Sequence, residues 1–186
     1  MTDPATLMEE QQAALADTDL CQQATQFVPY RGSDDPRILF IGEAPGKHED
    51  EQGKPFVGRA GDLLDEWIEG LGLTADEYAI TNLVKCRPPE NRAPTGEEAQ
   101  RFGTWLEKEI DVFDPAIIVP LGSSATAYLL PDTRQEPFLD AVCYTEHTYE
   151  ERTVIPLPHP AYGLRQGGMD LDYDRLTPLF EGDTDR

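Results

Sequence analysis

The chain has 186 residues, of which 39% are hydrophobic and 9% aromatic, and its formal net charge is −21. This length and composition fit one soluble globular domain with a hydrophobic core, and no apolar run approaches the roughly 20 residues of a membrane helix. The N-terminus lacks the basic and apolar regions of a secretory signal. We therefore expect a cytoplasmic protein with one domain over 1–186, which includes a helical segment at 1–30 and a C-terminal helix and tail at 170–186.

The charge arises from 36 acidic against 15 basic residues. It repels nucleic acid at low ionic strength and, taken alone, argues against a DNA partner. However, the acidic residues are spread along the whole chain, and lysine is scarce beside arginine. This pattern indicates the surface of a halophilic protein, because molar salt leaves a Debye length of about 3 Å and screens the repulsion. An ordinary acidic cytosolic protein is the alternative.

The first predicted elements form a helix, a strand and a second helix. The opening helix begins at Pro4, with Asp3 as its N-cap. The run 38–41 is too apolar to be half exposed and indicates a buried parallel strand. A long loop rich in glycine, proline and charge is expected over 43–58, and a helix over 60–71.

The same order of strand and helix then repeats. A second strand is predicted over 79–84, and a helix over 95–113 follows a proline-rich loop. Thr95 and Glu98 have the spacing of a capping box, which supports a helix start there. The apolar run 116–121 predicts a third strand.

The last third of the chain gives a weaker pattern. The hydroxyl of Ser123 or Ser124 is expected to cap a short helix over 125–130. Short antiparallel pieces are predicted around 141–144, and a fourth strand over 153–157. Four strands alternating with helices predict an α/β fold, a three-layer α/β/α sandwich with a central four-stranded, mainly parallel sheet. Ligands of such folds bind beyond the carboxyl ends of the strands.

Polar side chains follow three of the predicted strands. Glu43 and Glu49 follow the first, Asn82 lies at the end of the second and His159 follows the fourth. Cleavage of a bond between a sugar and a base needs a carboxylate near the sugar, a stabilised leaving group and a pocket for the extracted base. The arrangement therefore suits hydrolysis of an N-glycosidic bond.

Four segments resemble motifs of one family in order and spacing. They are GEAPGKHED at 42–50, GKPFVGRAG at 53–61, ITNLVKCRPP at 80–89 and HPAY at 159–162. Together they are similar to the iron-sulfur branch of the uracil-DNA glycosylases, over roughly residues 37–168. The match in several parts makes the resemblance specific.

The resemblance implies catalytic roles for three residues. Glu43 and Glu49 would flank the sugar and place the attacking water or stabilise positive charge, with either one as the essential carboxylate. His159 would donate a hydrogen bond to a uracil carbonyl oxygen and so hold the departing base as an anion. Without the motif, each Glu could equally be a solvated carboxylate of a loop. His159 could be a structural residue that only holds the end of the strand in place.

The resemblance also implies a base-binding group of Gly42, Phe56 and Asn82. The amide of Asn82 presents a donor and an acceptor to the Watson-Crick edge of uracil and would leave a buried group unpaired with cytosine. Phe56 would stack on the extruded base. The alternatives are an asparagine that bonds its own backbone in a turn and a phenylalanine that covers the core.

Contacts to the DNA itself are expected from five further residues. Arg59, Lys85 and Arg87 would meet phosphates, with ordinary surface ion pairs as the alternative for each cation. Leu164 and Arg165, in a glycine-rich segment, resemble the family's wedge into the duplex and would fill the gap left by the flipped base.

The chain departs from the family at the cofactor. Members of the branch hold an iron-sulfur cluster with four cysteines, and only Cys21 and Cys86 remain here as remnant ligand positions, because Ala24 and Phe102 occupy the other two. Two thiolates do not hold a four-iron cluster. We therefore expect no cofactor and no metal, free thiols, and Phe102 filling the vacated space. Cys143, in apolar surroundings, is expected to be a buried thiol.

Together these features predict a monofunctional uracil-DNA glycosylase that starts base excision repair. It would act as a monomer on single- or double-stranded uracil-containing DNA and would not bind a membrane. The motifs contain no lysine placed to form a Schiff base, so the enzyme would not cut the DNA strand. One alternative is an altered superfamily member that binds damaged DNA or another nucleobase without efficient excision. A nucleotide-binding doubly wound domain is a further alternative, disfavoured because no G-x-G-x-x-G or Walker loop is present.

Overall fold

The computed structural model describes residues 2–181, which fold around a six-stranded sheet in the order β1-β3-β2-β4-β6-β5. The central strands are mutually parallel: β3 (Tyr78–Asn82), β2 (Ile38–Gly42), β4 (Ile117–Pro120) and β6 (Arg152–Val154). Each edge carries a short antiparallel strand, β1 (Arg31–Gly32) or β5 (His147–Tyr149). The predicted parallel sheet of four strands is confirmed, and the edge strands extend it.

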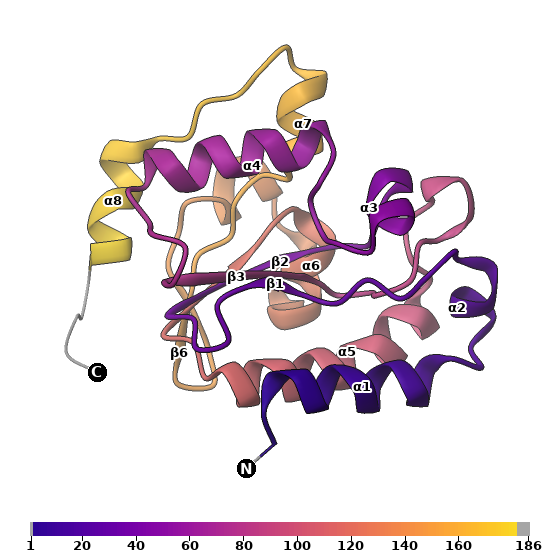
Figure 1. Ribbon diagram of the computed structural model, residues 1–186. Helices are drawn as coiled ribbons and strands as arrows, with labels where there is room; N and C mark the ends of the chain where they lie inside the picture. The colour runs from indigo at the N-terminus through magenta and orange to yellow at the C-terminus, as the bar shows by residue number, and fades with distance from the viewer. Residues whose placement is uncertain (1, 182–186) are drawn as a thin grey trace.

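Helices cover both faces of the sheet (Figure 1). One layer contains α1 (Pro4–Leu15), α5 (Gly96–Phe113) and α6 (Ser123–Leu129). The opposite layer contains α4 (Arg59–Gly70), α7 (Pro160–Arg165) and α8 (Tyr173–Glu181). The shorter helices are α2 (Asp19–Gln23), α3 (Lys47–Gln52), η1 (Pro89–Asn91), η2 (Pro131–Gln135) and the π-helix η3 (Phe138–Val142). The predicted three-layer α/β/α sandwich is confirmed.

The continuous apolar run of β2 is explained by this double coverage. Leu39 and Ile41 pack into the core beneath α5, while Ile38 and Phe40 pack into the core beneath α4. Every residue of β2 is therefore buried, as is usual for a central parallel strand. Its carboxyl end, at Gly42, leads directly into the segment that carries Glu43 and Glu49.

Two of the three predicted helix caps are present. The side chain of Asp3 accepts a hydrogen bond from the backbone N–H of Thr6 at 3.0 Å. Thr95 and Glu98 form a reciprocal capping box, in which Glu98 accepts from the Thr95 N–H at 2.7 Å and Thr95 accepts from the Glu98 N–H at 3.2 Å. These side chains satisfy backbone donors that the first turn of a helix leaves open.

Three local predictions were wrong. The expected loop over 43–58 contains α3, which has no apolar stripe and was invisible to hydrophobic periodicity. The N-cap of α6 is Gly122 and makes no side-chain cap hydrogen bond, so neither serine caps this helix. Ala141 and Val142 belong to the end of η3 and residues 143–144 to a turn, so 141–144 contains no strand, since short apolar runs do not distinguish helix from strand.

The C-terminal helix expected within 170–186 is α8, and residues 182–186 of the expected tail lie outside the described residues. Within residues 2–181, no helix is both long enough and apolar enough to cross a membrane.

Candidate active site

A cavity of about 520 Å³ opens at the carboxyl ends of the parallel strands. Its lining residues come from the segments that follow β2, β3, β4 and β6, and include Glu43, Glu49, Phe56, Asn82, Gly122, Ser123, His159 and Arg165. The two carboxylates, the amide, the imidazole and the aromatic ring singled out in the sequence thus surround one space. The volume is in the range of small-ligand pockets, about 300–1,000 Å³.

Asn82 presents an open hydrogen-bond acceptor at the cavity. It is the last residue of β3 and is only 2% exposed. Its Oδ1 atom has no hydrogen-bond partner among the described residues, although the residue lines the cavity. Buried polar atoms are nearly always hydrogen-bonded, and an exception calls for an explanation. A ligand that donates a hydrogen bond from within the cavity supplies one.

Gly42 allows the base-binding residues to approach each other. It is the register partner of Asn82 in the parallel pair β2 and β3. A Cβ atom at Gly42 would lie 2.3 Å from Asn82 Oδ1 and 2.6 Å from the ring of Phe56. Neither distance is sterically possible, so this position requires glycine.

Phe56 is held in an unusual backbone conformation. Its φ is 52°, in the left-handed region, and the residue is 6% exposed. Arg31 donates from Nε to the Pro55 carbonyl oxygen at 3.0 Å and from Nη2 to the Phe56 carbonyl oxygen at 3.4 Å, while pairing with Asp65 at 2.6 Å. Such backbone conformations persist where the surroundings enforce them, often at functional sites. The ring lies 5.8 Å from that of His159, centroid to centroid.

His159 is positioned by the helix that it precedes. It is the N-cap of α7, and its Nδ1 accepts a hydrogen bond from the Ala161 N–H at 3.1 Å. Burial, helped by the charge of Arg165, lowers the pKa of His159 to about 4. The ring is therefore neutral at pH 7, and because Nδ1 is an acceptor, the proton resides on Nε2. His159 is a neutral hydrogen-bond donor beside the cavity.

Gly122 is a site residue that the sequence analysis missed. Its φ is 89°, and a Cβ atom there would lie 3.0 Å from the Cβ of His159. A side chain at this position would be strained and would press on the imidazole. The signal was present in the Gly-Ser pair at the end of the third strand, which was interpreted only as the start of a helix.

The two carboxylates differ in their freedom. Glu49, in the first turn of α3, accepts a hydrogen bond through Oε2 from the Gly46 N–H at 3.1 Å. The Glu43 side chain has no hydrogen-bond or ion-pair partner in the described part of the chain, although it lines the same cavity. One carboxylate is therefore fixed in orientation, and the other is free to turn toward a water or a ligand.

The cations expected at DNA fall into two groups. Arg59, at the start of α4, and Arg165, at the mouth of the cavity, are exposed. Arg87 is half-buried and donates from Nε to Asn91 Oδ1 at 2.8 Å. Leu164, beside Arg165 on α7, is half-buried. The placement of these residues leaves the predicted DNA contacts open to test.

Lys85 does not fit its predicted role. Its side chain is fully buried, and Nζ lies 2.8 Å from Oε1 of the equally buried Glu109. The prediction that Lys85 meets a phosphate is therefore wrong. Its place in a basic stretch of sequence was misleading, because the partner lies 24 residues away on α5.

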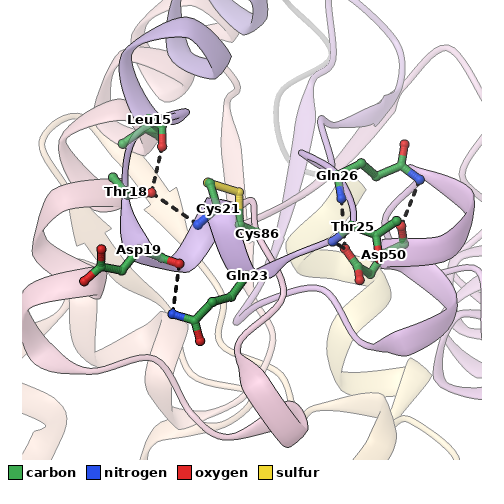
Figure 2. Close-up of a disulfide and its surroundings, with 9 residues drawn as sticks. All are labelled: Leu15, Thr18, Asp19, Cys21, Gln23, Thr25, Gln26, Asp50 and Cys86. Atoms are coloured by element: carbon green, nitrogen blue, oxygen red, sulfur yellow. Dashed lines mark hydrogen bonds between the residues drawn. A yellow bond between two sulfur atoms is a disulfide. The ribbon is translucent and has the colours of Figure 1, made fainter.

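Cys21 and Cys86 form a disulfide, with their Cα atoms 5.1 Å apart (Figure 2). The expectation of free thiols is therefore wrong for these two cysteines. A separation of 65 residues along the chain gave no spacing signal from which the bond could be predicted. Cys143 is free and buried as expected, and burial raises the pKa of its thiol to about 12.

The residues present do not fit a four-iron cluster. Two of the four expected ligand positions are occupied by Ala24 and by Phe102, which is buried in the same hydrophobic core as Cys86. The two remaining sulfur atoms are bonded to each other. Within residues 2–181, no three His, Cys, Asp or Glu side chains converge as a metal-binding group. A cluster needs four ligands, and this donor set does not supply them.

The α/β fold, with one cavity at the carboxyl ends of its parallel strands, agrees with the family to which comparison with known proteins assigns the chain. The sequence profile of the uracil DNA glycosylase superfamily matches residues 29–178, and the chain belongs to this superfamily.

Within the superfamily the chain is similar to type-4 uracil-DNA glycosylases. It is 37% identical over 161 residues to that of Archaeoglobus fulgidus, covering 84% of this chain and 81% of the relative. It is 40% identical over 147 residues to the Thermotoga maritima protein, covering 79% and 76%. It is 42% identical over 152 residues to the Sulfurisphaera tokodaii protein, covering 78% and 69%.

Proposed function

We propose that this protein is a uracil-DNA glycosylase, which hydrolyses the N-glycosidic bond of uracil flipped out of DNA and so begins base excision repair. The observation that carries the proposal is the buried, unpartnered Oδ1 of Asn82 in a cavity that also contains Glu43, Glu49 and His159. The type-4 uracil-DNA glycosylases to which the chain is similar support it.

Uracil matches the open hydrogen-bonding groups of the cavity. Its N3–H donates to Asn82 Oδ1, and its O4 accepts from the amide nitrogen of the same side chain. Cytosine has an acceptor at N3 and an amino group at C4, so both bonds would be lost and buried groups left unpaired, which a binding site penalises strongly. Phe56 offers a ring on which the flipped base stacks.

The catalytic groups suit a transition state with a positively charged sugar and a negatively charged base. Glu43 and Glu49 place negative charge near the sugar, where a dry pocket strengthens the interaction. The Nε2–H of His159 donates to the uracil oxygen as the base leaves as an anion. No lysine lines the cavity in the described part of the chain, so water, and not a Schiff base, completes the reaction. The product is an abasic site.

The enzyme acts in the cytoplasm as a monomer on single- or double-stranded DNA. Arg59, Arg87 and Arg165 contact phosphates, and Leu164 with Arg165 fills the gap left by the flipped base. The exposure of Arg165 at the mouth of the cavity supports this orientation. Because counterion release contributes little at high salt, base stacking and contacts to the base edge supply more of the affinity.

The test is excision from uracil-containing single- and double-stranded oligonucleotides in molar KCl, followed by heating in alkali to cut abasic sites. Strand cleavage is expected with uracil and not with cytosine. Glu43→Gln and Glu49→Gln are each compared with Glu51→Gln, an exposed carboxylate of α3 outside the cavity. The variant of the essential carboxylate should lose about 100-fold in rate. Binding of uracil-containing DNA without cleavage by the native protein would instead support the altered, non-excising member.

Gly42→Ala is predicted to abolish most of the excision activity, because the methyl group would displace Asn82 or Phe56. A misplacement of about 1 Å in an active site costs about 100-fold in rate. Gly96→Ala is the control, since a Cβ atom there meets open space. Single-turnover excision assays compare the two proteins, and a native rate for Gly42→Ala would contradict the assigned role of the glycine.

The acidic surface is proposed to be an adaptation to high salt. Its support is the net charge of −21 together with the spread of acidic residues over the chain. At molar KCl the repulsion among carboxylates is screened. A thermal unfolding series should show Tm falling steeply as KCl is withdrawn from molar to about 0.1 M concentrations. A Tm independent of KCl would identify an ordinary acidic protein.

The enzyme is also proposed to work without an iron-sulfur cluster. The support is the bond between Cys21 and Cys86 and the burial of Phe102 in place of a ligand. Protein purified anaerobically should contain no iron and show no absorption shoulder at about 400 nm, where clusters with cysteine ligands absorb. A shoulder that bleaches on reduction would overturn this proposal.

A further inference from the structure

A fully buried polar network lies at the carboxyl end of β3. Lys85 donates from Nζ to the side-chain oxygen of Thr81 and, at 2.6 Å, to the backbone carbonyl oxygen of Asn82. The same Nζ lies 3.0 Å from Oε2 and 2.8 Å from Oε1 of Glu109. Thr81 in turn donates its hydroxyl proton to Glu109 Oε2 at 2.9 Å. Lys85, Thr81 and Glu109 are all 0% exposed.

The hydrogen bonds of this network are complete for a charged lysine. An ammonium group has three N–H donors, and three acceptors surround it: the Thr81 hydroxyl, the Asn82 carbonyl and the Glu109 carboxylate. Burial lowers the pKa of Lys85, while the neighbouring Glu109 opposes this shift. The geometry is therefore that of an ion pair in which every lysine donor has a partner, while Glu109 Oε1, 2.8 Å from Nζ, has an ionic contact but no hydrogen bond among the described residues.

Burying such an ion pair in a protein core is energetically unfavourable compared with burying apolar side chains. Removing both charges from water costs several kcal/mol per ion, and well-packed apolar residues often stabilise a protein as well or better. Stability alone therefore explains the network poorly. Its position suggests another role, because it holds the peptide group of Asn82, whose side chain has the open acceptor of the cavity.

Within residues 2–181, Asn82 is the one member of this network that lines the cavity. Lys85, Thr81 and Glu109 are absent from the cavity lining, so none of them contacts a bound base. The chain turns immediately after Asn82, where the Leu83 and Val84 N–H groups bond to the carbonyl oxygens of Gly42 and Glu43. The lysine bonds the carbonyl of Asn82 on the opposite side of the same peptide group, so both polar atoms of this peptide group have a partner.

We propose that Lys85, Glu109 and Thr81 are positioning residues for uracil recognition: their buried network fixes the backbone of Asn82, so that its amide is already oriented when the base arrives. This inference rests on the proposed function and adds to it the residues that set specificity from beneath the pocket. It predicts that the network can be replaced without loss of the fold but not without loss of excision.

Thr81 provides a matched pair of variants. Thr81→Val keeps the shape and removes the hydroxyl that joins Lys85 to Glu109, whereas Thr81→Ser keeps the hydroxyl. For Thr81→Val we expect kcat for uracil excision to fall about 10- to 100-fold at a temperature where the variant is fully folded. Thr81→Ser should stay within about threefold of native. If both variants lose stability but keep native kcat, the network is only structural and the inference is overturned.

Charge removal gives an independent measurement. Lys85→Met and Glu109→Gln each leave one buried partner unpaired and are expected to lower Tm. The double variant Lys85→Met/Glu109→Met restores an apolar match and should recover much of the Tm while kcat stays at least about 10-fold below native. Recovery of both Tm and kcat would overturn the inference, and Thr81→Val decides the matter if the double variant does not fold.

A base-free probe separates positioning from general damage to the DNA surface. DNA that carries a tetrahydrofuran abasic-site analogue makes the backbone and wedge contacts but has no base for Asn82 to bind. Its Kd should change less than about twofold in Thr81→Val, while excision of uracil slows. Equal losses in both measurements would argue for a general structural defect. If the native protein does not excise uracil at all, the proposed function fails first, and that outcome is distinct from native-like excision by the variants.

Discussion

Replacing His159 with alanine is expected to lower the single-turnover rate of uracil excision by about 10²- to 10³-fold, the loss typical for removal of one donor to a developing anion. The reason is the fixed tautomer: Nδ1 is occupied by the Ala161 N–H, so Nε2 carries the proton that the leaving base needs. His147→Ala is the control, because His147 lies on β5, outside the cavity, with its Nε2 2.7 Å from Thr145 Oγ1. A native rate for His159→Ala would exclude the histidine from the chemistry.

The pH dependence gives a second measurement of the same residue. With its pKa lowered to about 4, His159 stays neutral as pH falls through about 6.5, where an exposed histidine would gain a proton. The pH profile of kcat should therefore contain no step at about pH 6.5 that belongs to His159. Any step that the native protein shows at about pH 6.5 should also be present in His159→Gln. Protonation of Nδ1 would place two N–H groups against each other at Ala161, so the active geometry is lost only in stronger acid.

The same shift makes a prediction for stability. Between pH 4 and pH 6.5 the unfolded chain protonates this histidine and the folded chain does not. The contribution to the free energy of unfolding is therefore present above about pH 6.5 and is lost as pH falls toward 4. Denaturant titrations across this range should show a steeper loss for the native protein than for His159→Gln. Equal slopes for the two proteins would contradict the lowered pKa.

The sequence was informative where one residue and its neighbours decide the structure. The buried strand over 38–41 could be predicted because a strand covered on both faces must be apolar throughout. Asn82 and His159 could be placed together because both follow strands whose carboxyl ends share one edge of the sheet. The capping box of Thr95 and Glu98 is equally local.

The failures concern pairs of residues distant in the chain. Lys85 and Arg87 are both basic residues of one stretch of sequence, but Lys85 is the one whose side chain is fully buried. Its burial is possible because Glu109 on α5 forms an ion pair with it. The disulfide partners Cys21 and Cys86 are likewise brought together only by the finished fold. Gly122 shows a subtler limit, since its need for glycine arises from the Cβ of His159, a neighbour that no local pattern reveals.

The disulfide lies where it can support the active site. It joins α2 to the segment directly after β3, four residues beyond Asn82 (Figure 2). The chain that follows α2 is tied a second time, because Asp50 of α3 accepts hydrogen bonds from the N–H groups of Thr25 at 2.9 Å and Gln26 at 3.2 Å. One N-terminal segment thus connects the helix that carries Glu49 with the loop that follows Asn82. Loss of the bond should loosen both sides of the pocket.

Replacing both bonded cysteines with serine should cost on the order of 4 kcal/mol in the free energy of unfolding, because the bond closes a loop of 65 residues in the unfolded chain. Urea titrations of native protein and of Cys21→Ser/Cys86→Ser measure this loss. Reductant should destabilise the native protein and leave the double variant unchanged, which controls for effects on the buried thiol of Cys143. Because neither sulfur lines the cavity, a slower excision would come from the loosened segments and not from a lost contact to the base.

The state of the two cysteines in the cell decides between a disulfide and a cluster more directly than any assay on purified protein. Cytoplasmic thiols are normally kept reduced, so at the proposed cytoplasmic location a bond found only after purification in air would come from oxidation during purification. Intact cells are first treated with an alkylating agent, and the protein is then denatured without reductant in the presence of the same agent. Cys21 and Cys86 should stay unmodified throughout, and the buried thiol of Cys143 should be labelled once the protein is denatured. Labelling of all three cysteines, with no iron in the protein, would mean that the pocket is held without either crosslink. Iron bound in place of the disulfide would overturn both the bond and the proposal that the enzyme works without a cluster. Its further ligands would have to come from other residues, because Ala24 and Phe102 occupy two of the four cysteine positions.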